Sequence, residues 1–489
     1  STPIKSSAAS DVYKRQIYTY AQSDYLQYDV ETGVSVSTGA HTPFWLVANK
    51  YGISSIKRNT AYLSAGVFHQ ENPLKKFSYA WGLELAGAHR FTSGFFVQQA
   101  YLDLRYYDFV LSIGSKERGS ELKNDALSTG GLSLSSNARP VPQVRISIPD
   151  FVPIPGCRNW LHVKGHLAYG RFTDDSFQTD YVQGKNKYTK NALYHSKALF
   201  VKLENEKIPF SVTAGIEMMA QFGGDCYYPN GHVYRTPHKL KDFFKVLLPG
   251  NGDGDASESD QINVLGNHLG SYHLAVEYRF PTWKVRGYYE HPFEDHSGME
   301  FAYGMWEDCL VGLEVTFPKN RIIESLVAEY LYTKDQSGAF HFLNYNDNAL
   351  WGRNYTGADN YYNNGQYTGW EHWGMGLGNP LLTSPIYNGK NDLTFRNNRV
   401  EGFHIGLNGE PVQGLRYRFL LSATRNWGTY DTPFDDIENS WNGMAELSYS
   451  PEKWNGWTFT LSAAADAGDL LGRSTGGMIT IRKTGGFNL

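Results

Sequence analysis

Residues 210–222 read FSVTAGIEMMAQF and carry the repeat that decides the fold. The even-numbered positions from Phe210 through Ile216 to Phe222 are apolar, while Glu217 and Gln221 fall between them. This period of two predicts a β-strand with one apolar face, because in a helix the same residues would spread around the whole surface. Twelve steps of ~3.3 Å at ~45° tilt span a height of about 28 Å, which matches the apolar band of an outer-membrane barrel. We expect Phe210 and Phe222 to lie at the two membrane surfaces, with a long strand of a soluble β-sandwich as the alternative.

The same alternation recurs along the chain and predicts further strands. The predicted strands are residues 28–38, 60–69, 77–86, 95–106, 108–115, 142–149, 160–171, 196–204, 210–222, 272–280, 283–289, 307–317, 321–333, 402–409, 415–427, 443–450, 457–466 and 476–487. We therefore predict an all-β fold, a transmembrane antiparallel β-barrel of about 18 strands, since bacterial barrels have an even strand number.

The connections between these strands alternate in length. Those after even-numbered strands are short, as at Pro281-Thr282, and most of those after odd-numbered strands are long, as at 116–141, 223–269 and 334–401. Short turns at one end and long loops at the other are typical of a transmembrane barrel. Loops of this length would be unusual in a soluble sandwich.

Composition narrows the class of protein. The chain has 489 residues, 15% aromatic residues and 50 glycines, and no run approaches the ~20 apolar residues of a membrane helix. A net charge of −4 indicates no nucleic-acid partner. The three cysteines Cys157, Cys226 and Cys309 form no CxxC pair and predict neither a zinc site nor a disulfide framework, and a Cys157–Cys226 disulfide is the less favoured alternative.

The N-terminal residues call for a separate interpretation. Residues 6–16, SSAASDVYKRQ, resemble a translated sequencing-adapter tail, and we interpret 17–22 as the remnant of a signal peptide. We expect residues 1–22 to be a non-structural tail and residues 23–489 to form a single barrel domain.

One helix is predicted in the long loop, near residues 237–248. Thr236 would cap it and Pro237 would take its first position. Its apolar stripe consists of Leu240, Phe243, Phe244 and Leu247. We expect this stripe to pack on the barrel wall or on other loops, with membrane-surface binding as the less favoured alternative.

Several segments together resemble a known family. They are TPFWLVANKYG at 42–52, STGGLSLSSNARPVPQVRISI at 128–148, GNHLGSYHLAVEY at 266–278, YYEHPFEDHSGM at 288–299 and NYYNNGQYTGWEHWGMGLGNPL at 360–381. The chain after residue 25 resembles the capsule assembly proteins of the Wzi type. The resemblance implies an occluded eighteen-stranded barrel in the outer membrane of a Gram-negative bacterium. It also implies a lectin that holds capsular polysaccharide at the cell surface, and it does not imply catalysis. We predict that the protein is not an enzyme and has no cofactor.

Two alternatives to this function remain from the sequence. A pore for sugars or other small solutes would show single-channel conductance, whereas an occluded lectin would show almost none. An outer-membrane hydrolase would turn over lipid or glycan. The sequence leaves open which polysaccharide and which loop are involved, and the oligomeric state.

Aromatic residues among Asn, Gly and Asp in the loop 351–381 are the main glycan-binding candidates. Sugars present an apolar C–H face and a rim of hydroxyls, which aromatic rings with amide neighbours match. The candidates are Trp351, Tyr355, Tyr361, Tyr362, Tyr367, Trp370 and Trp373, together with Asn137 and Arg139 before Pro140. The alternative is that the aromatic rings pack the loop over the lumen and that Asn137 and Arg139 lock their loop into the barrel.

Other polar clusters have plainer interpretations. Glu294 to Ser297 are consecutive, whereas members of a catalytic triad normally meet from separate segments. The acidic residues from Asp253 to Asp260 lack the glycine and glutamate spacing of an EF-hand loop. His162 and His166 are expected in the lumen with Lys164 between them, because all three share one strand face. We predict no metal site.

Overall fold

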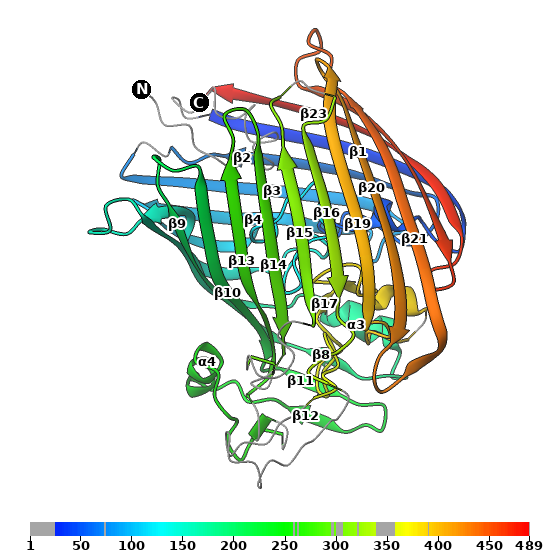
Figure 1. The fold of residues 1–489 in the computed structure, drawn as a ribbon. Coiled ribbons are helices and arrows are strands. Elements are labelled where there is room, and N and C mark those ends of the chain that lie inside the picture. The colour runs from blue at the N-terminus through cyan, green and yellow to red at the C-terminus, as the bar shows by residue number, and fades with distance from the viewer. Residues whose placement is uncertain are drawn as a thin grey trace.

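Alternating strands close into a β-barrel in the computed structural model (Figure 1). The structure describes residues 25–72, 75–257, 260–261, 264–294, 298–299, 307–319, 322–338, 357–389 and 391–488. The first strand, β1 (Tyr25–Gly39), pairs antiparallel along its whole length with the last strand, β23 (Ser474–Asn488). Figure 1 shows them side by side in blue and red. The barrel is closed by this pairing, so its described sheet leaves no free edge.

Within the described residues the barrel has eighteen strands, each paired antiparallel with its neighbours in chain order. Between β1 and β23 these are β2 (Thr60–His69), β3 (Phe77–His89), β4 (Phe95–Tyr106), β5 (Phe109–Ser115), β6 (Gln143–Pro153), β7 (Leu161–Arg171), β9 (Leu193–Glu204), β10 (Phe210–Phe222), β13 (Asn267–Arg279), β14 (Lys284–Phe293), β15 (Cys309–Thr316), β16 (Ser325–Tyr332), β19 (Val400–Val412), β20 (Leu415–Gly428), β21 (Pro433–Tyr449) and β22 (Trp457–Gly468). The predicted all-β barrel and its strand number are confirmed.

The loops contain smaller elements. These are α2 (Phe44–Val47), α3 (Asp175–Val182), β8 (Tyr188–Lys190), β11 (Asp225–Tyr227), β12 (Val233–Arg235), α4 (Leu240–Leu247), β17 (Glu371–His372), β18 (Met375–Gly376) and the 3₁₀ helix η2 (Pro385–Asn388). Most of them gather at one end of the barrel in Figure 1, opposite the start of β1 and the end of β23. In the described part of the chain, no helix has the length and apolar character needed to span a membrane.

The two faces of β10 follow the predicted alternation. Thr213 and Glu217 point inward and are buried, while Phe210 points outward and is exposed. The neighbouring strands β9 and β13 present Leu199 and Leu274 outward in the same way. Because one face of each strand is apolar and exposed, the outside of the barrel has the surface that a membrane-spanning barrel requires.

Phe222 was predicted at a membrane surface, but its side chain is covered there by protein. Phe222 points outward, but its side chain is only 1% exposed. Its ring lies 5.0 Å from the ring of Phe243 in α4, centroid to centroid. The side chain is covered by a helix of the following loop, a contact that the strand pattern cannot reveal.

The predicted helix is present, but it begins later than expected. The structure begins α4 at Leu240 with Lys239 as N-cap residue, in place of Thr236 and Pro237. The Asp242 carboxylate accepts the backbone N–H of Lys239 at 2.6 Å and so satisfies one donor of the first turn. Thr236 is instead tied to Gly224, whose carbonyl accepts its backbone N–H and its hydroxyl.

Two further differences concern the start of one strand and the presence of one helix. β21 begins at Pro433, ten residues before the predicted strand, because it forms a long hairpin with β20. Helix α3 was not predicted, since its stretch DSFQTDYV is only weakly amphipathic.

The middle of the barrel is filled by the loop between β5 and β6, residues 116–142, which we call the plug. Lys123 of the plug forms a buried ion pair with Glu290 of β14, with 2.8 Å between Nζ and Oε2. Glu329 of β16 accepts hydrogen bonds from the hydroxyl groups of Ser128 at 2.5 Å and Thr129 at 2.8 Å. These carboxylates, on two strands that are separated by β15, hold the plug across the lumen.

Inward-facing charges on the strands also bind the plug. The guanidinium of Arg418 lies 2.9 Å from the Glu446 carboxylate and donates to the carbonyl of Ala126 at 3.2 Å. Lys164 pairs with Glu121 of the plug at 2.6 Å, whereas His166 bonds Ser196 of the neighbouring strand β9 at 2.6 Å. The lumenal positions predicted for Lys164 and His166 are confirmed.

Candidate functional site

Four of the predicted loop aromatic residues lie inside the packed interior. Tyr361, Tyr362, Tyr367 and Trp370 have at most 4% of their surface exposed. Trp370 donates from its indole N–H to the carbonyl of Ser133 in the plug at 2.8 Å. The hydroxyl of Tyr362 donates to Leu132, also in the plug.

The two remaining buried tyrosines bond to other parts of the long-loop end. The hydroxyl of Tyr361 donates to the Asp308 carboxylate at 2.9 Å, and that of Tyr367 donates to the carbonyl of Gly223 at 3.2 Å. Trp370 and Tyr362 therefore bond the loop 357–389 to the plug, and Tyr361 and Tyr367 bond it to other loops, as the alternative interpretation proposed. Trp351 and Tyr355 lie outside the described residues.

Asn137 also holds loops together. Its side chain is fully buried, and its amide N–H₂ donates to the carbonyl of Gly376 at 2.9 Å and to the hydroxyl of Ser384 at 3.2 Å. Its amide oxygen accepts the backbone N–H of Asn49 at 3.2 Å. Because the Asn137 side chain is inaccessible to a ligand, we interpret it as a structural link between the plug and the loop 357–389.

Arg139 and Trp373, by contrast, meet at a cleft of about 230 Å³. The guanidinium carbon of Arg139 lies 3.7 Å from the ring centroid of Phe96 and 4.6 Å from that of Trp373. The lining comes from several loops at the long-loop end and comprises Gly52, Ser54, Ser55, Ile56, Lys57, Thr92, Arg139, Tyr181, His372, Trp373, Met375, Ile386 and Gly389. We call this the Arg139 cleft.

Trp373 stands at the tip of a tight hairpin. β17 and β18 are joined by Trp373 and Gly374, whose φ angles are 58° and 82°. Positive φ at both positions is the type I′ geometry, which favours Gly or Asn over a bulky residue. A tryptophan held in this region is strained, and such strain often marks a functional position.

The hairpin is anchored by buried polar groups. The Glu371 carboxylate accepts the backbone N–H of Gly374 at 2.7 Å and the hydroxyl of Thr368 at 2.8 Å. His372 bonds the carbonyl of Arg139 at 2.9 Å through Nδ1, which must therefore carry the proton, while Nε2 faces the Thr173 hydroxyl at 3.0 Å. Burial lowers the pKa of His372, so the ring is neutral at pH 7. These bonds fix Trp373 beside Arg139.

Arg139 is a buried cation with unused donors. Its side chain is 5% exposed, and Nη2 donates to the Thr92 hydroxyl at 3.1 Å. Nε and Nη1 are buried without a hydrogen-bond partner among the described residues. Burial lowers the pKa of Arg139 to about 10, against the opposing effect of Asp174, so the group stays positively charged at neutral pH. Such a charge favours an anionic group in the cleft.

The other polar clusters are structural in the described residues. Asp253 pairs with Lys241 and Lys245 at 2.5 Å each, and Asp255 pairs with Lys239 at 2.7 Å. In the described part of the chain no group of His, Cys, Asp or Glu is arranged to hold a metal ion. Glu294 accepts the backbone N–H of Tyr362 at 2.5 Å, and residues 295–297 lie outside the described residues. The three cysteines are free thiols.

Sequence reasoning had identified Arg139 and Trp373 but not the rest of the cleft. Lys57, Thr92 and Tyr181 come from segments with no recognisable motif. Only the Trp-Gly pair between Glu371-His372 and Met375 gives a local signal, that of a two-residue hairpin.

An antiparallel eighteen-stranded barrel with an apolar exterior, long loops at one end and a plugged lumen is an outer-membrane β-barrel. The family model described as Capsule assembly protein Wzi matches residues 31–379, well over half of the chain. The protein belongs to this family. A search of curated protein sequences found no match.

Among solved structures, the fold is similar to that of Wzi from Escherichia coli, described as an outer membrane protein involved in group 1 capsule assembly and a carbohydrate-binding β-barrel. The TM-score is 0.57 at 13% identity, with 98% of this chain and 89% of the other covered. OccK11 (OpdR) of Pseudomonas aeruginosa matches with a TM-score of 0.48 at 9% identity, covering 95% and 96% of the two chains. OccAB4 of Acinetobacter baumannii matches with a TM-score of 0.46 at 10% identity, covering 96% and 100%.

Proposed function

We propose that this protein binds capsular polysaccharide at the long-loop end of its barrel and helps to assemble or anchor the capsule at the cell surface. Membership of the capsule assembly family supports the role, and the similar Escherichia coli protein is described as binding carbohydrate. The observation that carries the proposal is the Arg139 cleft, where a strained tryptophan lies beside a buried cation.

The cleft combines the two kinds of surface that a sugar needs. Trp373, Met375 and Ile386 offer apolar contact for the C–H face of a sugar ring. Arg139 and Lys57 supply positive charge for an acidic substituent. We propose that an acidic sugar residue of the capsule chain occupies this cleft, with its ring against Trp373 and its acid group toward Arg139.

The proposed role is binding without turnover or transport. Two buried carboxylates, Glu371 and Asp174, accept backbone N–H groups from the hairpin that carries Trp373 and hold it in place. The plug fills the lumen and is held there by the buried ion pair of Lys123 with Glu290. A polysaccharide would therefore be held on the outside, while the outward strand faces contact outer-membrane lipid.

Replacement of Trp373 by alanine tests the proposal. We expect Trp373→Ala to weaken binding of purified acidic capsule fragments in isothermal titration calorimetry, and Trp373→Tyr to restore much of it, because a second aromatic ring can stack on sugar. Trp454→Ala is the matched control, since Trp454 is an exposed tryptophan at the short-turn end.

Heat-modifiable gel mobility of each variant reports whether the barrel is folded. Native mobility with wild-type binding in Trp373→Ala would remove this cleft from the binding site. An equal loss in Trp454→Ala would mean that the assay reports nonspecific adsorption.

A further inference from the structure

Helix α4 lies on the outside of the barrel wall, at the long-loop end of β7, β9 and β10 (Figure 1). Tyr169 of β7 and Phe222 of β10 both point outward, as the strand alternation requires. The rings of both pack against Phe243 of α4, with centroids 5.3 Å and 5.0 Å away. The helix therefore covers wall surface that would otherwise face the membrane.

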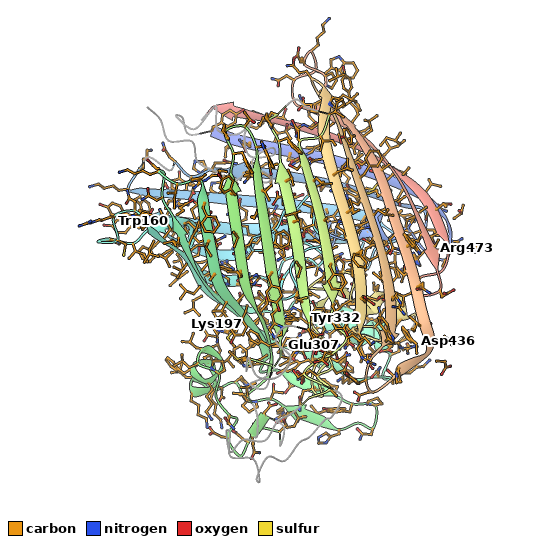
Figure 2. All side chains as sticks on the ribbon, viewed as in Figure 1. Trp160, Lys197, Glu307, Tyr332, Asp436 and Arg473 are labelled. Atoms are coloured by element: carbon orange, nitrogen blue, oxygen red, sulfur yellow. The ribbon has the colours of Figure 1, made fainter. Side chains whose placement is uncertain are left out.

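Polar bonds fix the helix in this position. The hydroxyl of Tyr169 donates to the carbonyl of Phe243 at 2.7 Å. The ammonium of Lys197, on the outward face of β9, donates to the carbonyls of Val246 at 3.0 Å and Leu247 at 2.5 Å. Figure 2 shows Lys197 on the wall directly beside α4. A lysine on an outward strand face is costly unless it is paired, and here it satisfies the last carbonyls of the helix.

The opposite face of α4 is apolar and uncovered. Leu240, Phe244 and Leu248 are 76%, 62% and 74% exposed. Their spacing of four residues places them on one side of the helix, while Val246 is fully buried on the other. Three large apolar side chains on one stripe are more than scattered surface residues, so the stripe requires an occupant.

The surroundings of the stripe indicate what that occupant is. On the same strand as Lys197, toward the short-turn end, Leu199, Val201 and Leu203 also point outward and are exposed. The apolar band of the barrel therefore continues onto α4. At ~3.3 Å per residue and ~45° tilt, Phe222 lies about 28 Å from Phe210 along the barrel axis. The helix therefore lies at the limit of the apolar band at the long-loop end.

We propose that α4 lies in the outer leaflet of the outer membrane, with Leu240, Phe244 and Leu248 inserted among the lipid acyl chains. An amphipathic helix in this position buries its apolar side about 5–10 Å into the boundary between head groups and acyl chains. The flanking lysines 239, 241 and 245 have the sign that anionic lipid attracts, although their pairing with Asp253 and Asp255 limits that contribution. The helix thus fixes the height of the 223–266 loop relative to the membrane, independently of any glycan.

Tryptophan fluorescence in lipid vesicles tests this placement. Full-length Phe244→Trp protein is reconstituted in phosphatidylcholine vesicles with bromine near the head-group end of one acyl chain, and in the same vesicles without bromine. The wild-type signal is subtracted. Val233→Trp is the control, because Val233 is exposed in β12 of the same loop, which Figure 1 places farther from the wall.

We expect the added emission of the Phe244→Trp variant to be blue-shifted and strongly quenched by bromine, and that of the Val233→Trp variant to be red-shifted and unquenched. Red-shifted, unquenched emission from position 244 would overturn the proposal, because the stripe would then face water. Blue-shifted emission without bromine quenching would also overturn it, since protein and not lipid would then cover the stripe. Leu248→Trp repeats the measurement at a second exposed position and must agree with Phe244→Trp.

Discussion

At the scale of single residues, Arg139 is a cation whose charge is not neutralised by a carboxylate bonded to it among the described residues. Two of its guanidinium nitrogens have no partner in that part of the chain, and two aromatic rings shield it from water. A charge in such surroundings acts more strongly on a ligand than one in open solvent. At ~4 Å the attraction for a unit negative charge is about 1 kcal/mol in water and about 4 kcal/mol near a protein surface of lower effective dielectric.

We therefore predict that Arg139→Gln weakens binding of acidic capsule fragments by about 1 to 4 kcal/mol, within the range set by that attraction. Binding of the same fragments after reduction of their carboxyl groups should change little. Calorimetry at two salt concentrations measures both effects, and the wild-type protein should lose affinity for the acidic fragment at the higher salt. Equal losses for acidic and reduced fragments would show that Arg139 acts only through loop structure.

A second residue-scale prediction concerns the outward face. Leu313 in the middle of β15 is 49% exposed and points outward. Leu313→Arg should lower the free energy of unfolding in lipid vesicles by about 2–4 kcal/mol, whereas Tyr449→Arg at the short-turn end of β21 should cost about 0–1 kcal/mol. Urea unfolding monitored by fluorescence compares the two variants. Similar costs at both sites would contradict the placement of Leu313 near mid-membrane.

Glu217 is not a suitable control position for these arginine substitutions, although the alternation along β10 places its side chain on the lumenal face. Glu217 points into the lumen as predicted, but it is buried there because the plug fills the space. A longer arginine side chain would therefore clash inside the barrel. Parity identifies the face of a strand, whereas the contents of the lumen depend on a loop that is distant in sequence.

At the scale of elements, the plug depends on one buried ion pair. Lys123 and Glu290 are almost completely inaccessible to solvent, and Glu290 also accepts the backbone N–H of Leu132 at 2.8 Å. Removing one partner leaves a buried charge, which typically costs about 3–5 kcal/mol. Lys123→Met should therefore speed hydrogen exchange across residues 123–135.

The double variant Lys123→Met with Glu290→Gln is the internal control. It removes both charges and should recover part of the protection, because no unpaired ion remains. Exchange as slow in the single variant as in the wild type would mean that the other plug contacts, such as those to Glu329, are sufficient without this pair.

Strand existence and order could be predicted from the sequence because each strand has its own alternation and turn signals. The early start of β21 and the cover over Phe222 could not, since both depend on pairing or packing with another segment. The site shows the same limit. Tyr367, Trp370 and Trp373 are close in sequence and all aromatic, yet only Trp373 lines the cleft. Trp370 is buried because its indole bonds the plug, a contact with a segment that is distant in sequence.

At the scale of the whole molecule, the amount of capsular polysaccharide that stays on the cell distinguishes a role in anchoring the capsule from a role in its synthesis. Cells lacking this protein should release capsular polysaccharide into the medium while making the same total amount. Cell-bound and free polysaccharide are assayed separately, with the wild-type gene restored on a plasmid as control. A fall in total polysaccharide would indicate a role in synthesis and contradict the proposed anchoring role.

The filled lumen leads to the last prediction, which separates a binding barrel from a pore. The plug crosses the barrel from the end of β5 to the start of β6, where Gly114 pairs with Gln143, so a short turn can replace it without moving either strand. We expect the wild-type protein in planar bilayers to show almost no steady conductance. Replacement of residues 122–136 by a short Gly/Ser linker should raise the conductance, because the wall would stay closed by the β1–β23 pairing while the ion-paired plug is gone. Heat-modifiable mobility verifies that the shortened barrel is folded. Large open channels in the wild-type protein would instead favour a pore for sugars or other small solutes.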